Sequence, residues 1–80
     1  MTKRQQQIYD FIITYIGENL YPPTIQEIGE GVGLASKSSV FNHLLAIQNK
    51  GYIEVKNNSP RAIKVNGYKF VKEDELCMSN

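Results

Sequence analysis

The stretch of sequence richest in candidate chemistry is "ASKSSVFNHL", in which three serines and a lysine occupy four consecutive positions. Ser36 has the spacing of a helix N-cap, and Ser38 and Ser39 would lie in the first turn. Short hydroxyls and N–H groups at a helix start suit a phosphate, because that end carries a partial positive charge. Lys37 is unfavourable to the helix dipole there, and a phosphate would compensate for it. The alternative is that the serines only cap the helix and Lys37 is only a solvated cation.

Two further side chains on the same predicted helix could contact nucleic-acid bases. Asn42 shares the exposed face of Ser38 and Ser39, and asparagine can pair bidentately with adenine. Phe41 lies off the expected core stripe, so it would either touch a thymine methyl group or fold onto the segment that follows. His43 has no cysteine or carboxylate cluster beside it, so we expect a packed residue rather than a metal ligand or a base.

The first of three helices that would position these residues opens at Thr2. Gln5 follows three residues later, which is the spacing of a capping box. An apolar stripe with helical spacing then runs through Ile8, Phe11, Ile12, Tyr15 and Ile16. Tyr9 lies off this stripe. The prolines of "ENLYPP" are expected to end the helix, because they remove backbone donors.

Two more helices are expected before residue 51. Thr24 and Glu27 form a second capping box, and the helix that they open should end near Gly31 or Gly33, where glycine permits a left-handed turn. The third helix would begin at Ser36 and close at the glycine of "NKGYI". Its buried side and flank are expected at Val40, Leu44, Leu45, Ile47 and Gln48.

The spacing of apolar residues changes from helical to alternating after the third helix. "YIEVK" and "RAIKV" alternate, and the polar cluster "NNSP" between them predicts a β-hairpin. "NG" indicates another turn, after which "YKFVK" would add a further extended piece. Lys56, Arg61 and Lys64 make the hairpin basic, so Arg61 and the hairpin tip are expected to grip a nucleic-acid backbone. A charged hairpin that only aids solubility is the alternative.

Three helices followed by a two-stranded hairpin predict an α+β fold, a winged helix-turn-helix over residues 1–65. In such folds the third helix enters the DNA major groove by its N-terminal end. Residues 66–80 are expected to form an acidic and partly disordered extension. Residues 1–72 carry a net charge of 9 − 5 = +4, and the last eight carry −3. A basic body of this kind is compatible with a nucleic-acid partner.

Composition excludes several classes of function. A chain of 80 residues with 41% apolar content fits one small domain. Its single cysteine, Cys77, cannot form an internal disulfide, and no zinc-ligand set accompanies it. No signal peptide or membrane-spanning run is visible, so we expect a cytoplasmic protein. No nucleophile, base and orienting group converge, so neither an enzyme, a cofactor nor a small-molecule substrate is expected.

The segments "RQQQIYDFI", "YPPTIQEIG", "VGLASKSSVFNHL", "KGYIE" and "PRAIKV" together resemble the N-terminal DNA-binding domain of the LexA (SOS) repressor family. The resemblance covers roughly residues 1–65. It implies a repressor that binds a palindromic operator, and the family's base-contacting positions fall on Ser36, Ser38, Ser39, Phe41 and Asn42. Phe41 and Asn42 differ from the residues expected in well-known members, so the family's operator sequences are not transferred.

The resemblance stops before the family's second domain. LexA proteins continue into a self-cleaving peptidase domain, which nothing after Val65 supplies. A complete chain of this kind would bind DNA without self-cleavage, whereas in a fragment of a longer chain the missing part could still hold the peptidase. The tail does not resemble the family's linker, which favours a stand-alone protein. Family members dimerise mainly through the second domain, so at most a weak homodimer is expected. The alternative function is a protein-interaction module, a decoy or antirepressor-like partner of a related repressor.

Overall fold

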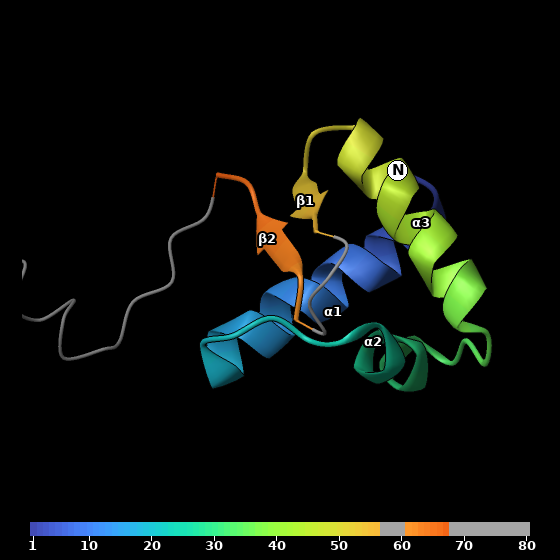
Figure 1. Ribbon diagram of the computed structural model, residues 1–80, viewed down its shortest axis with the longest axis horizontal. Helices are drawn as coiled ribbons and strands as arrows, with labels where there is room; N and C mark the ends of the chain where they lie inside the picture. Colours follow the sequence, from blue (N-terminus) through green and yellow to red (C-terminus); the bar gives the residue numbers. More distant parts are fainter. Residues whose placement is uncertain (57–60, 68–80) are drawn as a thin grey trace, which may run out of the picture.

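The computed structural model describes residues 1–56 and 61–67, which form three helices and then two strands (Figure 1). The helices are α1 (Lys3–Asn19), α2 (Ile25–Val32) and α3 (Lys37–Asn49), and the strands are β1 (Ile53–Val55) and β2 (Ile63–Val65). The predicted order of elements is therefore confirmed, although each strand is shorter than its alternating segment. The hairpin tip at 57–60 and the extension from residue 68 lie outside the described residues.

Both predicted capping boxes are formed. The Thr2 hydroxyl accepts from the Gln5 amide at 3.2 Å, and the Gln5 side chain accepts from the Thr2 amide at 3.2 Å. At the start of α2, Thr24 and Glu27 exchange the same two bonds at 3.1 and 2.8 Å. These bonds satisfy amides that have no partner inside the helix, and so fix where α1 and α2 begin.

The two helix ends use left-handed residues of different kinds. Gly33 ends α2 with φ 79°, as the sequence predicts. Leu20 ends α1 with φ 64°, two residues before the prolines that were expected to stop it. A leucine in this region costs about 1–2 kcal/mol, because its Cβ crowds the next carbonyl. The chain bears that cost to turn from α1 towards α2.

One core joins the helices to the hairpin. Each helix packs on the other two, and β1 packs on α3. The buried apolar side chains are Ile8, Tyr9, Ile12, Ile16, Ile28, Val40, Leu44, Ile47, Ile53, Ile63 and Val65. Tyr9 is buried although it lies off the helical stripe, because Tyr52 covers it edge-on with ring centroids 5.5 Å apart. The stripe alone therefore understates the buried face of α1.

The hairpin is antiparallel and is bonded directly to α3. Glu54 lies opposite Lys64 in the register of β1 and β2. The Val55 amide donates to the Gln48 side chain of α3 at 2.6 Å. Figure 1 shows the hairpin beside the C-terminal half of α3, with α2 at the other end of that helix. The third helix is thus held at both ends.

Candidate nucleic-acid interface

The N-terminal turn of α3 presents the predicted serines and lysine. Ser36 is the N-cap, and its hydroxyl accepts a long bond of 3.4 Å from the Ser39 amide. Ser36, Lys37 and Ser38 are exposed, and Ser39 is half-buried. The Ser36 hydroxyl keeps its own hydrogen for donation, and the first amides of the helix have no intrahelical acceptor. The turn therefore offers several donors and a cation to an anionic ligand.

The next turn of α3 carries the other two predicted residues of this helix. Asn42 is exposed and follows Ser38 by four residues and Ser39 by three, so the three side chains lie on adjacent turns of one face. Phe41 is half-buried, as is His43. The structure thus brings Ser36, Lys37, Ser38, Ser39, Phe41 and Asn42 together on the first half of one helix.

The corner between α2 and α3 depends on Gly29 as well as on Gly33. A Cβ built on Gly29 would lie 2.7 Å from the Leu34 carbonyl oxygen and 3.4 Å from Cγ2 of Val40. Only a residue without a side chain lets α2 approach the chain that enters α3 this closely. The sequence predicted only a left-handed glycine near Gly31 or Gly33 at the end of α2, whereas the close approach at Gly29 lies about one turn earlier.

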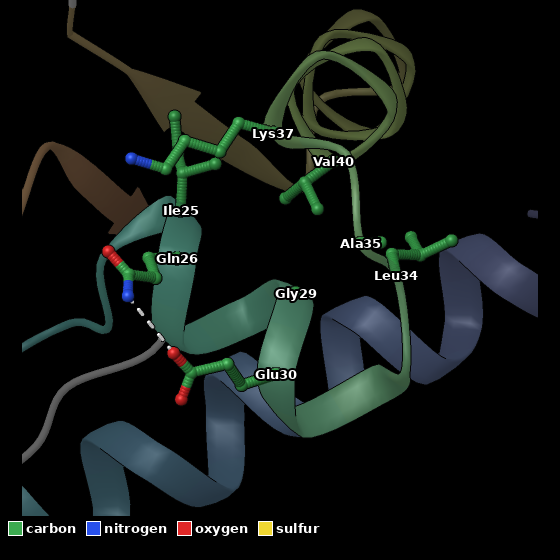
Figure 2. Close-up of a pocket in the computed structure, with 8 residues that line it drawn as sticks. All are labelled: Ile25, Gln26, Gly29, Glu30, Leu34, Ala35, Lys37 and Val40. Carbon is green, nitrogen blue, oxygen red and sulfur yellow. Dashed lines mark hydrogen bonds between the residues drawn. The ribbon is translucent and has the colours of Figure 1, made fainter.

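A cavity of about 410 Å³ opens beside this corner (Figure 2). The Lys37 side chain extends from α3 over the start of α2, and Glu30 accepts a bond from Gln26 at 3.1 Å on the α2 side. Among the residues that the structure describes, Lys37 forms no ion pair. Its charge is therefore available to a ligand.

Arg61 lies apart from the α3 residues and is engaged within the molecule. Its Nη1 donates to Glu27 Oε1 at 2.9 Å, to the Pro22 carbonyl at 2.7 Å and to the Tyr15 hydroxyl at 3.4 Å. Its guanidinium carbon lies 4.4 Å from the ring centroid of Tyr21. We call Arg61, Glu27, Tyr15 and Tyr21 the Arg61 clamp. That Arg61 also contacts nucleic acid stays a prediction.

The charges of the clamp stabilise one another. Glu27 accepts from the Thr24 amide and from Arg61, and these bonds lower the pKa of its carboxyl to about 2. The same carboxylate raises the pKa of the Arg61 guanidinium. Burial, chiefly, raises the pKa of the Tyr15 phenol, whose hydroxyl donates to Glu27 at 3.0 Å. At neutral pH the clamp is therefore a paired carboxylate and guanidinium.

The clamp partners of Arg61 were missed by the sequence analysis. The capping box did identify Glu27 as a residue at the start of α2, but capping uses only local spacing. Glu27 and Arg61 are 34 positions apart. No helical or strand period links residues at that separation, so only the folded chain reveals the pair.

Neither a metal cluster nor a membrane helix is found in the described part of the chain. Within residues 1–56 and 61–67, no group of three or more His, Cys, Asp and Glu side chains could hold a metal ion. In the same ranges no helix has the length and apolarity to span a membrane.

A capped three-helix unit with a glycine corner before α3, completed by an antiparallel hairpin, defines a winged helix-turn-helix protein. More particularly, the chain belongs to the LexA DNA-binding domain family, whose model matches residues 1–62. Membership of this family supports DNA binding and a role in the regulation of transcription.

Similar curated proteins are LexA repressors of Staphylococcus and Bacillus species. The chain is 49% identical over 65 residues to the LexA repressor of Staphylococcus carnosus, a match covering 81% of this chain and 31% of that protein. It is 51% identical over 67 residues to the LexA repressors of Bacillus mycoides and Bacillus thuringiensis, covering 84% of this chain and 33% and 32% of theirs. The chain thus spans about a third of the length of these relatives.

Proposed function

We propose that this domain binds double-stranded DNA in a sequence-specific manner and represses transcription, as a LexA-like regulator of the SOS response. The N-terminal turn of α3 enters the major groove, and the hairpin lies on the flanking backbone. The observation that carries the proposal is the exposed, cation-bearing start of α3 on a fold of this family. The names of the relatives support the repressor role.

Each α3 residue receives a role from its chemistry and position. The Ser36 hydroxyl and Lys37 bind phosphate at the positive end of the helix. Ser38, Ser39 and Asn42 contact base edges, with Asn42 suited to adenine. Phe41, half-buried beside them, supplies the apolar contact that a thymine methyl group accepts.

Selection of duplexes from a random DNA pool tests the proposal directly. We expect a consensus, and two copies of it about 10 base pairs apart if two domains bind together. On that consensus, contacts to about four to six phosphates give a slope of log affinity against log salt of about −4 to −5. A pool without enrichment, or a flat salt titration, would refute DNA recognition and favour the protein-interaction module instead.

Lys37→Ala, compared with Lys3→Ala, locates the contact. Lys3 is also exposed, but it begins α1, whose first turn is bonded to the far end of α3 through Lys50 and Gln5 at 3.3 Å. Lys37→Ala should weaken binding to all sequences and reduce the salt slope by about 1. Lys3→Ala should change neither quantity. Equal effects of the two substitutions would contradict the placement of α3.

The stoichiometry of binding is part of the proposal. We propose that the described domain self-associates weakly at most, so that a single half-site is bound with low affinity. Analytical ultracentrifugation at micromolar concentration, with and without a two-site duplex, measures this. A stable dimer without DNA would show that this chain carries an interface of its own.

A further inference from the structure

Arg61 joins the hairpin to the segment that carries α2. Its guanidinium reaches three separate parts of the chain: Tyr15 in α1, the Pro22 carbonyl in the connection, and Glu27 in α2. A second bond, from Nη2 to Glu27 Oε2 at 3.4 Å, makes the contact with Glu27 two-pronged. Arg61 itself stands two residues before β2. One side chain therefore connects the hairpin to both helices that precede α3.

The two Nη1 donors of Arg61 are already used in this arrangement. Nη1 carries two hydrogens and lies near three acceptors, so it has none left for a phosphate. The ring of Tyr21 lies against the guanidinium as well. A phosphate would have to displace a carboxylate that is itself anchored by the Thr24 amide at 2.8 Å. The geometry favours an internal contact over a DNA contact.

The clamp contacts α2, which packs on the helix that carries the proposed interface. α2 packs on α3, and the close approach at Gly29 transmits the position of α2 to the entrance of α3. The hairpin packs on the other end of α3 through β1. In the proposed function the start of α3 and the hairpin contact one DNA duplex. The clamp can fix the angle between them.

We propose that Arg61 is a positioning residue: with Glu27 it sets the angle between the hairpin and the α2–α3 unit, and it supports DNA binding through that angle. This inference rests on the proposed function. It replaces the direct backbone contact expected from the position of Arg61 in a basic hairpin.

Glu27→Gln separates the two roles by the sign of its effect. Glutamine can still complete the capping box, as Gln5 does at α1, so α2 should begin normally. The substitution removes a negative charge, which by electrostatics alone would tighten binding to DNA. Loss of the clamp predicts the opposite, a weakening of roughly five- to tenfold, the size expected when one hydrogen bond of ordinary net strength is lost. Glu30→Gln removes an equivalent charge from the same helix outside the clamp, and should tighten binding or leave it unchanged.

Arg61→Lys tests the other residue of the Glu27–Arg61 ion pair. Lysine keeps the charge but lacks the planar fork that reaches several acceptors at once. Binding should weaken about as much as in Glu27→Gln, and the double variant should be no weaker than either single one, because both act through one contact. Additive losses would show that Arg61 contacts DNA independently of Glu27, and would overturn the proposal.

A measurement without DNA reports the angle itself. Residual dipolar couplings of the backbone amides at 51–56 and 61–67 should fit the alignment tensor of the three helices in the wild type, and should depart from it in Arg61→Lys. Circular dichroism at the same temperature checks that the helices remain folded. Couplings that fit one tensor in both proteins would overturn the clamp. If the wild type binds no duplex, the proposed function fails, and the couplings still decide whether Arg61 orients the hairpin.

Discussion

The start of α3 and the Arg61 clamp both place a cation near the molecular surface, but in opposite surroundings. Lys37 is exposed and has no ion pair within the part of the chain that the structure describes. Arg61, whose side chain is 37% exposed, donates four hydrogen bonds and has an aromatic ring against it. Among the described residues Lys37 has no ion-pair partner, whereas Arg61 has three acceptors near the two hydrogens of its Nη1.

The contrast distinguishes Lys37, whose side chain is available to a ligand, from Arg61, whose side chain stabilises the fold. Lys37 and Arg61 contribute equally to the net charge, and both lie in elements that the sequence predicts to contact DNA. Their local energetics differ in sign: a cation at a helix N-terminus opposes the helix dipole, whereas Glu27 stabilises Arg61. A residue that costs stability without a ligand is the better candidate for binding one.

The largest effect is expected from Gly29→Ala, which moves the α3 turn without touching either cation. The new Cβ would lie 2.7 Å from a backbone oxygen, so the entrance to α3 must shift. We expect a loss of about 1–2 kcal/mol in the free energy of unfolding, net of the helix propensity that alanine adds, together with weaker DNA binding. Urea unfolding and a gel-shift titration measure the two effects.

Gly17→Ala is the matched control for that substitution. Gly17 lies inside α1, and among the described residues no atom outside its own stretch of helix comes within 4 Å of a Cβ built on it. Alanine should therefore raise the free energy of unfolding by about 0.5–1 kcal/mol and leave DNA affinity unchanged. If Gly29→Ala behaved in the same way, the close approach at the corner would not matter.

Ser36→Ala tests whether the exposed turn depends on its own cap. Loss of an N-cap costs about 0.5–2 kcal/mol, and the 3.4 Å bond to the Ser39 amide places this case near 0.5 kcal/mol. Ser36→Gly should lower the free energy of unfolding by only a few tenths of a kcal/mol, since glycine is a tolerated cap. Thermal unfolding resolves the difference, and a larger loss for glycine than for alanine would argue against a capping role.

Replacing each cation by alanine should change stability in opposite directions. Lys37→Ala should raise the free energy of unfolding by about 0.3–1 kcal/mol, because it removes an unfavourable charge from the helix start. Arg61→Ala should lower it, since Glu27 and the Pro22 carbonyl lose their donor. Urea unfolding at low ionic strength measures both. Two shifts of the same sign would remove the distinction between the regions.

The smallest effect is expected from pH, since the clamp is partly exposed to solvent. Bonds from Thr24 and Arg61 lower the pKa of Glu27 to about 2 from an ordinary value of 4.5. A carboxyl with a lowered pKa adds stability at neutral pH, and this contribution is lost as the pH falls from about 5 towards 2. The stability difference between wild type and Glu27→Gln should therefore narrow over that range. A difference that stays constant would mean that the carboxylate charge contributes nothing.

Local patterns predicted the framework of the fold. The two capping boxes, the left-handed Gly33 and the alternation on either side of the hairpin turn each depend on residues a few positions apart. Such signals act within one element, so a single sequence carries them in full. The α3 face was predictable for the same reason, because Ser36 to Asn42 lie on one helix.

Contacts between elements were not predictable in this way. The burial of Tyr9 depends on Tyr52, 43 positions later in the sequence, and the clamp joins Glu27 to a residue beyond the hairpin tip. The left-handed Leu20 is a further case, since leucine has no preference for that conformation and the fold imposes it. Each of these features arises from packing between distant segments, for which a helical or strand period gives no signal.

The bond from the Val55 amide to Gln48 also limits how the two-stranded ribbon could grow. In this register the amides of Glu54 and Lys56 face β2. The amide of Val55, which lies between them, therefore points to the outer edge of β1. Unpaired edge amides are templates on which a foreign strand can assemble. Because the Val55 amide is already bonded to Gln48, a strand from another molecule is hindered from pairing with β1. Such a strand would have to pair with β2 instead.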